Sequence, residues 1–312
     1  MCTRTGYHAR MDVIDWLLEG DPAIRWQVMR DLTGADPAAV AAERARVAHE
    51  GLGAAILARQ GADGAWHLPD EPDWLPTLHM STLLRATGAA PADPVVDAAL
   101  TRLATGFRWH EEFGAKTFFE GEVEPCINGR ALALGGYAGR QTRSLAQRLL
   151  DDQLDDGGWN CDAPRSTRSS FHSTICVLEG LLAYEHAIGA DPAVAAARRR
   201  GAEYLLARGL FRRRSTGAVA DPGFLLLSFP SRYRYDVLRG LEYLRDANIA
   251  PDERVDEAVQ LLRDRRTADG RWLLDASYTD GIDVSLGESV GEPSRWITLR
   301  ALRVLRWYDA ER

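Results

Sequence analysis

Side chains that can bind metals or move protons gather in two stretches of the sequence, residues 118–130 and 157–176. The first stretch carries three glutamates and a cysteine, and the second carries two cysteines and a histidine: Glu120, Glu122, Glu124 and Cys126, then Cys161, His172 and Cys176. Carboxylate, thiolate and imidazole groups are the usual zinc ligands. Clustered carboxylates resist joint ionisation, so one of them can also serve as a proton donor. The sequence therefore admits metal-ion or acid catalysis in these stretches.

The same residue types also have purely structural roles. Cysteine often packs as a small apolar side chain, a histidine in a helix is commonly hydrogen-bonded inside the core, and loop carboxylates are usually solvated. Cys176 lies among Ile175, Val177 and Leu178, and we assign it to the core.

Three copies of a short phrase recur along the chain, at residues 62–66, 155–159 and 268–272. Each ends in tryptophan, and each is followed by a loop and an apolar helical run. Degenerate copies at residues 106–109 and 221–224 lie between them. The implied unit of roughly 45 to 60 residues is typical of a helix, a turn and a second helix.

The elements that carry these phrases are predicted to be helices. Asp-Pro pairs such as Asp21-Pro22 begin amphipathic segments, and alternating strand patterns are absent. A second class of helix is apolar on most sides and belongs in the interior. These inner helices are expected at Leu78–Ala86, Cys126–Gly135, Phe171–Tyr184, Tyr235–Leu244 and Trp296–Trp307, with a first one near Ile24–Leu32. The sequence predicts an all-α fold of about six hairpins in an inner and an outer layer, forming one domain over residues 1–312.

Composition and charge limit the expected binding partners and the expected cellular location. A net charge of -7 argues against nucleic acid as a partner, since phosphate binding needs a concentrated positive surface. The amino terminus lacks the apolar core of a secretory signal, and no later segment has the run of apolar residues that spans a membrane. We expect a cytoplasmic protein with reduced thiols at Cys2, Cys126, Cys161 and Cys176. The oligomeric state stays open.

The Asp-Gly-Gly-Trp phrase at residues 156–159, preceded by Gln153, together with the alternating helices, resembles a known architecture. It is similar to the α/α toroid shared by squalene-hopene and other class II terpene cyclases, protein prenyltransferase β-subunits and complement-type thioester domains. The resemblance covers most of the chain. It implies that Trp66, Trp159 and Trp272 tie outer helices together and do not contact substrate.

In the prenyltransferases a catalytic zinc is held by Asp-x-Cys at one inner-helix start and by a histidine at the next. The matching residues here are Glu124-Pro125-Cys126 and His172. The resemblance therefore implies zinc bound by Glu124, Cys126 and His172, with the fourth position open for water or a substrate thiolate, as catalytic sites require. Cys161 in place of Glu124 would resemble the zinc site of the lanthionine cyclases, although their Cys-His-Gly motif is missing.

Departures from these families limit the chemistry. Glu120 and Glu122 stand where prenyltransferases carry basic residues, so strong diphosphate binding there is not expected, although Arg130, Arg165 or Arg168 could compensate. The Asp-x-Asp-Asp acid of class II cyclases and the Gly-Cys-Gly-Glu-Gln of thioester domains are both absent. Glu120 or Glu122 is the alternative proton donor.

Further residues are expected to line a central cavity suited to an apolar or cationic small molecule. The predicted substrate-binding residues are Trp74, His79, Trp109, Arg130, Tyr233 and Arg295. Tyr235 and Asp236 form a candidate acid–base pair. A long polar insertion, residues 275–292, is a candidate lid that brings Asp283 or Glu288 to the cavity.

Three functional hypotheses follow. The first is a zinc-dependent enzyme that acts on an isoprenoid-like or thiol-bearing molecule by alkyl or prenyl transfer, or by Lewis-acid cyclisation. The second is a metal-free relative of the terpene cyclases that uses a glutamate as acid. The third is a non-catalytic toroid that binds a small molecule or a protein.

Overall fold

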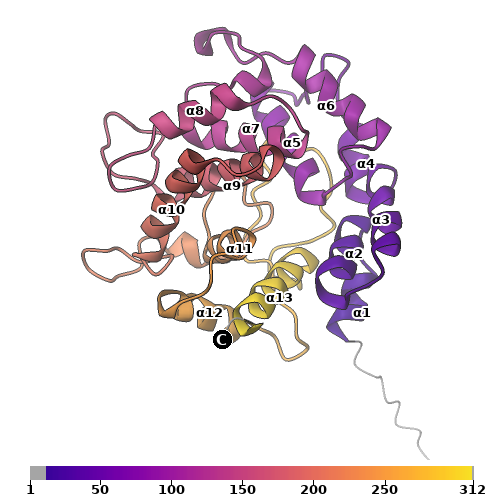
Figure 1. The fold of residues 1–312 in the computed structure, drawn as a ribbon. Coiled ribbons are helices and arrows are strands. Elements are labelled where there is room, and N and C mark those ends of the chain that lie inside the picture. Colours follow the sequence, from indigo (N-terminus) through magenta and orange to yellow (C-terminus); the bar gives the residue numbers. More distant parts are fainter. Residues whose placement is uncertain (1–11, 311–312) are drawn as a thin grey trace, which may run out of the picture.

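The computed structural model describes residues 12–310, and Cys2 lies outside that range. Helices form all the regular secondary structure of the described residues, which otherwise contain only isolated β-bridges (Figure 1). The predicted all-α fold is confirmed. Among residues 12–310, no helix combines the length and the apolar character needed to cross a lipid bilayer.

One set of helices forms a closed series of contacts. Each member packs against the next, and the last packs against the first: α2 (Pro22–Val28), α4 (Gly51–Leu57), α5 (Trp74–Thr87), α7 (Pro125–Tyr137), α9 (Phe171–Ile188), α11 (Val237–Asp246) and α13 (Arg295–Ala310). The other helices flank this series in Figure 1: α1 (Val13–Leu18), α3 (Pro37–Ala45), α6 (Pro94–Gly106), α8 (Arg143–Asp151), α10 (Pro192–Leu206) and α12 (Asp256–Asp264). Short 3₁₀ or π turns occur at Met29–Thr33, Arg46–Ala48, Glu111–Phe113, Phe118–Glu120, Pro222–Leu225 and Glu253–Val255.

The predicted helix starts are confirmed by their caps. Asp21, Asp36, Asp93 and Asp191 each accept backbone N–H groups at the start of a helix whose first residue is proline. This pairing satisfies donors that the first turn leaves free and presets the backbone for the helix. The apolar inner segments form α5, α7, α9, α11 and α13, with ends that differ from the predicted ranges by a few residues.

The tryptophan phrases have the structural role expected of them. The indole N–H groups of Trp66, Trp159 and Trp272 donate to the carbonyls of residues 56, 149 and 262, at 2.8, 2.6 and 2.7 Å. All three rings are buried. Each ring therefore fixes the end of one helix against the loop that leads to the next, which repeats one joint three times around the molecule.

The glutamines before two of these phrases tie neighbouring helices together. Gln153 donates from Nε2 to the carbonyls of Gly157 and Ala197, and Gln60 does the same to Gly64 and Ala99. Each glutamine thus links its own loop to the following flanking helix, α10 or α6. A Cβ at Gly64, whose φ is +84°, would lie 2.2 Å from a backbone oxygen, so the phrase requires glycine there.

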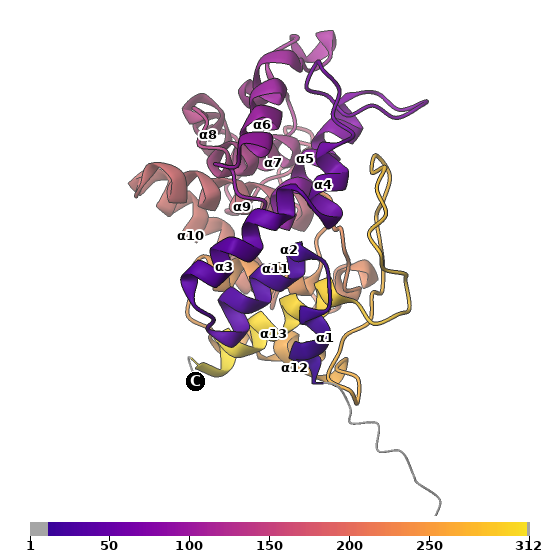
Figure 2. The same ribbon diagram turned by 90° about the vertical axis from the view of Figure 1, so that its right-hand side faces the viewer.

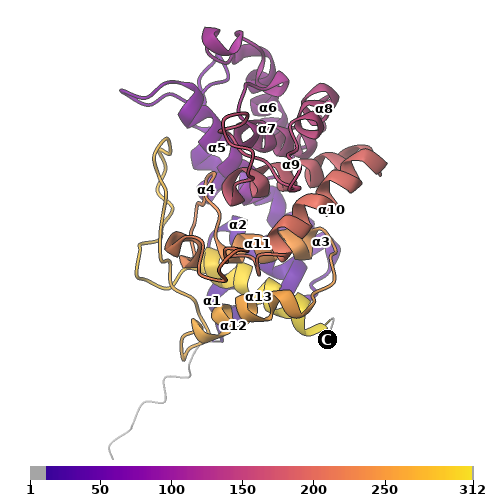
Figure 3. The same ribbon diagram turned by 90° about the vertical axis from the view of Figure 1, so that its left-hand side faces the viewer.

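The molecule has one continuous hydrophobic core, in which Trp16 near the start and Tyr308 near the end belong to the same cluster. The segment 275–292 is not helical. It extends along the end of the molecule where α13 begins, opposite the side where the chain ends (Figures 2 and 3). That placement puts it beside the first turns of the inner helices.

Candidate metal centre and central cavity

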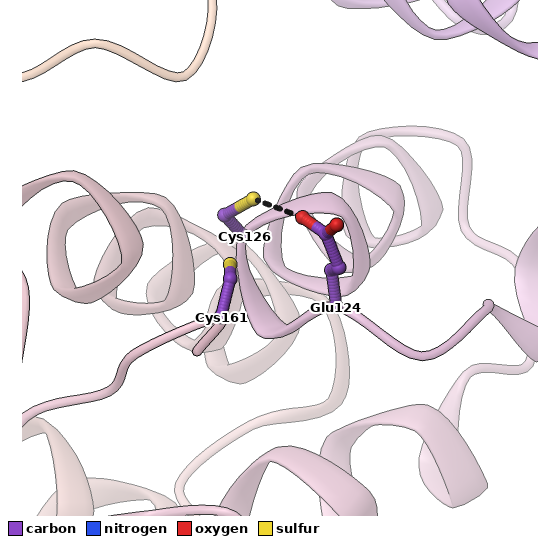
Figure 4. A group of neighbouring side chains, drawn as sticks. All are labelled: Glu124, Cys126 and Cys161. Atoms are coloured by element: carbon purple, nitrogen blue, oxygen red, sulfur yellow. Dashed lines mark hydrogen bonds between the residues drawn. The ribbon is translucent and has the colours of Figure 1, made fainter. Parts of the chain in front are cut away.

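Three possible metal ligands converge at the start of α7. Glu124 is the N-cap residue, Pro125 the first residue of the helix and Cys126 the second, while Cys161 comes from the loop between α8 and α9 (Figure 4). One ligand atom from each of Glu124, Cys126 and Cys161 lies within 4.8 Å of the other two. Pro125 begins the helix between the two ligands of α7. Glu124 and Cys126 lie on the side of α7 that faces the loop carrying Cys161 (Figure 4).

The electrostatic surroundings favour a thiolate at Cys161. The hydrogen bond from the Cys126 thiol is the main cause that lowers the pKa of Cys161, and Ser173 and the backbone N–H of Cys126 add to it against the effect of burial. The same contact and burial raise the pKa of Cys126. Cys126 Sγ also lies 3.5 Å from Glu124 Oε2, which is the alternative acceptor for its single thiol proton. The pair thus favours one thiolate and one thiol, and a metal bound by both sulfurs would displace the remaining proton.

The donor set and its spacing fit zinc. Tetrahedral zinc with Zn–S near 2.3 Å and Zn–O near 2.0 Å separates a sulfur from an oxygen by about 3.5 Å. The Cys126–Glu124 distance is 3.5 Å. Two thiolates and one carboxylate leave the fourth position for an exchangeable ligand, and the exposure of Glu124 gives that position access from solvent.

His172, the third ligand expected from the sequence, is outside this group. Its Nδ1 accepts the backbone N–H of Tyr235 at 2.8 Å, and its ring packs edge-on against Phe224 and Tyr233. A neutral imidazole that accepts at Nδ1 carries its proton on Nε2, so neither nitrogen has a free lone pair for a metal. Of the three predicted ligands, Glu124 and Cys126 therefore belong to the converging group, Cys161 joins them, and His172 does not.

Glu122, the predicted acid, is buried beside the group. Its carboxylate accepts the backbone N–H of Glu124 at 2.8 Å and that of Val123, and Asn128 holds its backbone from both sides. Burial is the main cause that raises the pKa of Glu122. The carboxylate orders the turn before α7, and its raised pKa is the property that an acid would need.

Tyr235 and Asp236, the predicted acid–base pair, make structural hydrogen bonds. The Tyr235 hydroxyl donates to the carbonyl of Leu210 at 2.6 Å. Asp236 caps α11, accepting the N–H of Arg239 at 2.8 Å and the hydroxyl of Ser228 at 2.5 Å. Neither residue lines the central cavity. Their positions at a helix start explain the polar pair, so a catalytic role has no geometric support.

The inner helices enclose a cavity of about 680 Å³. Its wall contains three acidic residues, Glu179, Glu242 and Asp246, and nine arginines: Arg30, Arg44, Arg85, Arg130, Arg232, Arg239, Arg245, Arg300 and Arg303. Aromatic rings are also present, including the stacked pair Phe229 and Trp296, whose centroids are 4.2 Å apart. The expected apolar wall is therefore strongly cationic.

Two of the six predicted substrate-binding residues, His79 and Arg130, line this cavity. The other four, Trp74, Trp109, Tyr233 and Arg295, are not part of its wall. Trp109 is buried in the core and its indole N–H donates to Phe118, while Arg295 donates to the carbonyl of Trp16 and lies over its ring. Sequence reasoning missed the arginines of α11 and α13, whose signal was a charged residue inside an otherwise apolar helical run.

The insertion reaches the cavity through two residues that were not expected. Ile282 belongs to the wall, and Asp280 pairs with Arg232 while its carbonyl accepts Nδ1–H of His79 at 2.9 Å. Asp283 instead pairs with Arg59 at 2.8 Å. Glu288 caps α13 by accepting the N–H of Arg295 at 2.7 Å. Segment 275–292 is thus anchored at the end of the cavity where the inner helices begin.

Comparison with known proteins does not assign this chain to a family. No protein-family model matches the chain, and no curated protein matches it. One solved structure, described as the crystal structure of a protein from Actinoplanes, aligns with 92% of this chain and 90% of its own at 16% identity. Its TM-score is 0.43, too low to support an inference about fold or function.

Proposed function

We propose that this protein is a zinc-dependent enzyme whose metal is held by Glu124, Cys126 and Cys161. The observation that carries the proposal is the convergence of a carboxylate and two thiols within 4.8 Å of one another. Two of the three come from one helix start and the third from a separate loop. An exchangeable fourth position distinguishes this donor set from the closed four-ligand sites that only stabilise a fold.

Zinc at this position would supply a Lewis acid and would favour the deprotonated form of a bound water or thiol. The residues of the chain set the conditions for that chemistry. Ser173 Oγ lies 3.2 Å from Cys161 Sγ and holds its orientation, and the N-terminus of α7 favours negative charge on both sulfurs. Glu122 lies beside the group, where its carboxyl group could exchange a proton with a substrate.

The reaction class remains part of the proposal. We favour transfer of an alkyl or prenyl group to a substrate thiol, with Lewis-acid cyclisation as the variant. In the transfer, the thiolate sulfur forms the new S–C bond, and the leaving group departs with the electron pair of the bond that breaks. The closed series of inner-helix contacts supports placing the chain among the α/α toroids that carry out such reactions. A reducing, cytoplasmic setting belongs to the same proposal, because only reduced thiols can ligate zinc.

A second candidate is favoured by one observation, the buried carboxyl of Glu122. Burial raises its pKa, which is the condition for a carboxylic acid to protonate an alkene in a metal-free cyclase. The two backbone N–H groups that it accepts favour its charged form, however, and it is absent from the cavity wall. We therefore favour the zinc-dependent enzyme over the metal-free cyclase.

Metal analysis of protein purified without a metal-affinity tag tests the proposal. We expect about one zinc per chain in the wild type, and a loss of affinity of about tenfold or more in Cys126→Ala and Cys161→Ala. Cys176→Ala is the control, because this thiol is buried between Arg239 and the carbonyl of Tyr233 and is not one of the three converging ligands. Replacing zinc by cobalt should give a sulfur-to-metal charge-transfer absorption in the wild type and in Cys176→Ala, and a much weaker one in Cys126→Ala and Cys161→Ala.

The ligand set is tested in the same series. His172→Gln should keep its zinc, because the proposal leaves this side chain unligated, whereas Glu124→Gln should weaken binding. Wild-type protein that refolds without metal and binds no added zinc would overturn the metal centre. Zinc loss in His172→Gln with retention in Cys161→Ala would restore the ligand set expected from the sequence.

A further inference from the structure

Arg130 is a buried cation without a counter-ion. Its exposed fraction is 4%, and its guanidinium lines the central cavity. Its one hydrogen bond runs from NH2 to the hydroxyl of Thr82 at 3.4 Å, and its buried Nε has no partner. Within residues 12–310, no carboxylate forms an ion pair with it. A buried, unpaired guanidinium is costly, so its retention in a cavity wall calls for a ligand.

The other arginines of the wall show how unusual this is. Six of the nine are paired with carboxylates of the chain: Arg30, Arg232, Arg239, Arg245, Arg300 and Arg303. Arg44 donates to the carbonyl of Gly88 and lies over the ring of Trp26. In the described part of the chain, Arg85 and Arg130 therefore form no ion pair, although the charge of Arg85 acts on Glu179, and both residues line the cavity.

These two arginines belong to one part of the wall. Thr82 and Arg85 are three residues apart on α5 and so share a helix face, and Arg130 of α7 reaches Thr82 across the interface between the two helices. The ring of Tyr137, also on α7, lies in the same wall. Two guanidinium groups, a hydroxyl and an aromatic surface thus converge on the cavity.

The neighbouring polar groups cannot neutralise this charge. His79 donates from Nδ1 to the carbonyl of Asp280 and accepts from Arg232 at Nε2, at 2.9 and 3.2 Å, which makes it neutral. Glu179 is already engaged by Arg239 through two hydrogen bonds of 2.7 Å. Although the chain as a whole carries a charge of -7, nine arginines and only three acidic residues line the cavity. Such a cavity attracts anions from solution.

We propose that the central cavity binds a small organic anion, whose phosphate or carboxylate group is held by Arg130, Arg85 and Thr82. Guanidinium groups recognise both oxyanions through paired N–H donors. The volume of about 680 Å³ accommodates an organic body, which packs against Tyr137. The proposed anion site is separate from the proposed metal centre, because none of the three proposed metal ligands belongs to the cavity wall. The two sites are neighbours, since Arg130 follows Cys126 by one turn of α7 and their charges interact.

Calorimetric titration with three matched probes tests the site: phenyl phosphate, benzoate and benzyl alcohol, at constant ionic strength. We expect phenyl phosphate or benzoate to bind and benzyl alcohol to bind at least about tenfold more weakly. Comparison of the two anions decides whether the site prefers a phosphate or a carboxylate. Each titration is run on metal-stripped and on zinc-supplemented protein, so that anion binding to zinc is recognised by its dependence on metal.

Arg130→Met removes the charge and keeps an unbranched apolar side chain. We expect it to lower the affinity for the preferred anion by at least about tenfold. Arg165→Met is the control, since Arg165 is exposed and pairs with Asp162. Without ligand, Arg130→Met should melt at the same or a higher temperature than the wild type, because it removes an unpaired buried charge. If this variant does not fold, Arg85→Gln, at a half-buried position, replaces it in the comparison.

Three results would overturn the site. They are the absence of binding by both anions, equal binding of benzyl alcohol, and unchanged affinity in the folded arginine variant. Anion binding that appears only with zinc would support the metal centre and contradict the proposed anion site in the cavity. Binding that persists without zinc would support the cavity site, whatever the outcome of the metal analysis.

Discussion

Histidine protonation in this protein is set by neighbouring groups, as the buried ring of His79 and the half-buried ring of His172 show. His172 accepts a backbone N–H, and His79 donates to one backbone carbonyl and accepts from Arg232. Burial lowers the pKa of both rings, and for His79 the charges of Arg130 and Arg232 help to lower it to about 2. Both side chains are therefore neutral supports of loops and helix starts at ordinary pH.

The pKa of His79 predicts a loss of stability in acid. Below about pH 6.5 the unfolded chain binds a proton at this position and the folded chain does not, so folding becomes less favourable as the pH falls. The effect is about 1.4 kcal/mol for each pH unit, or about 2 kcal/mol between pH 6.5 and pH 5. Urea unfolding across this range should show a flatter profile for His79→Gln than for the wild type.

Nuclear magnetic resonance provides the direct check. The His79 ring should show no titration above about pH 4. His67 is the internal comparison, because a hydrogen bond to Asp73 is the main cause that raises its pKa above the usual 6.5. Protonation of His79 near neutral pH would contradict the geometry of its contacts with Arg232 and Asp280.

At the scale of elements, the tryptophan phrases join each helix to its successor. The indole of Trp159 is fully buried, and its N–H donates to the carbonyl of Leu149, ten residues earlier. Its backbone N–H in turn donates to the hydroxyl of Thr174 on α9 at 3.0 Å. One residue thus ties α8, the loop that carries Cys161 and the start of α9.

Trp159→Phe is expected to destabilise the protein by about 2 to 3 kcal/mol, because it leaves a cavity and an unpaired buried carbonyl. The same change should weaken zinc binding, since the loop that carries Cys161 is held at Trp159. Trp74→Phe is the control, because the Trp74 ring is half-buried at the start of α5. Equal free energies of unfolding for the two variants would show that the contacts of Trp159 do not stabilise the protein.

The sequence predicted these elements well because helix caps, prolines and tryptophan phrases are local signals. The Asp-Pro starts and the inner helices lie where they were expected. The site was predicted only in part. Cys126 and Glu124 are two residues apart and could be recognised together, whereas the exchange of His172 for Cys161 depends on the direction of one ring. The charge of the cavity depends on which face of each helix turns inward, which apolar periodicity alone does not reveal for α11 and α13.

At the scale of the whole molecule, the first and last inner helices close the series through buried polar contacts. Arg303 of α13 pairs with Asp31 of the turn after α2 and donates to Gln27 Oε1 at 2.8 Å, across 276 residues of sequence. Arg306 adds a hydrogen bond of 2.8 Å to the carbonyl of Asp31. The first and last helices of the series are therefore held together by one cluster of polar contacts, in which Gln27 and Arg303 also line the cavity.

Asp31→Asn tests this closure. The substitution leaves the Arg303 guanidinium buried with a neutral partner, and a loss of about 2 kcal/mol is expected in urea unfolding, less than for a fully dry pair because Asp31 is partly exposed. Burial raises the pKa of Asp31, but Arg30 and Arg303 outweigh it and lower the pKa below its usual value. The stabilisation is thus present near neutral pH and is lost as the pH falls through the folded-state pKa.

The matched control is Asp309→Asn, which removes an exposed ion pair with Arg263 near the end of the same helix, α13. Its effect should stay within about 0.5 kcal/mol. Because Asp31 closes the series at the cavity rim, its loss should also speed hydrogen exchange in α2 and α13 more than in α7 and α9, which pack elsewhere in the series. Uniform exchange across all four helices, or equal effects of the two variants on the free energy of unfolding, would show that the series does not depend on this contact.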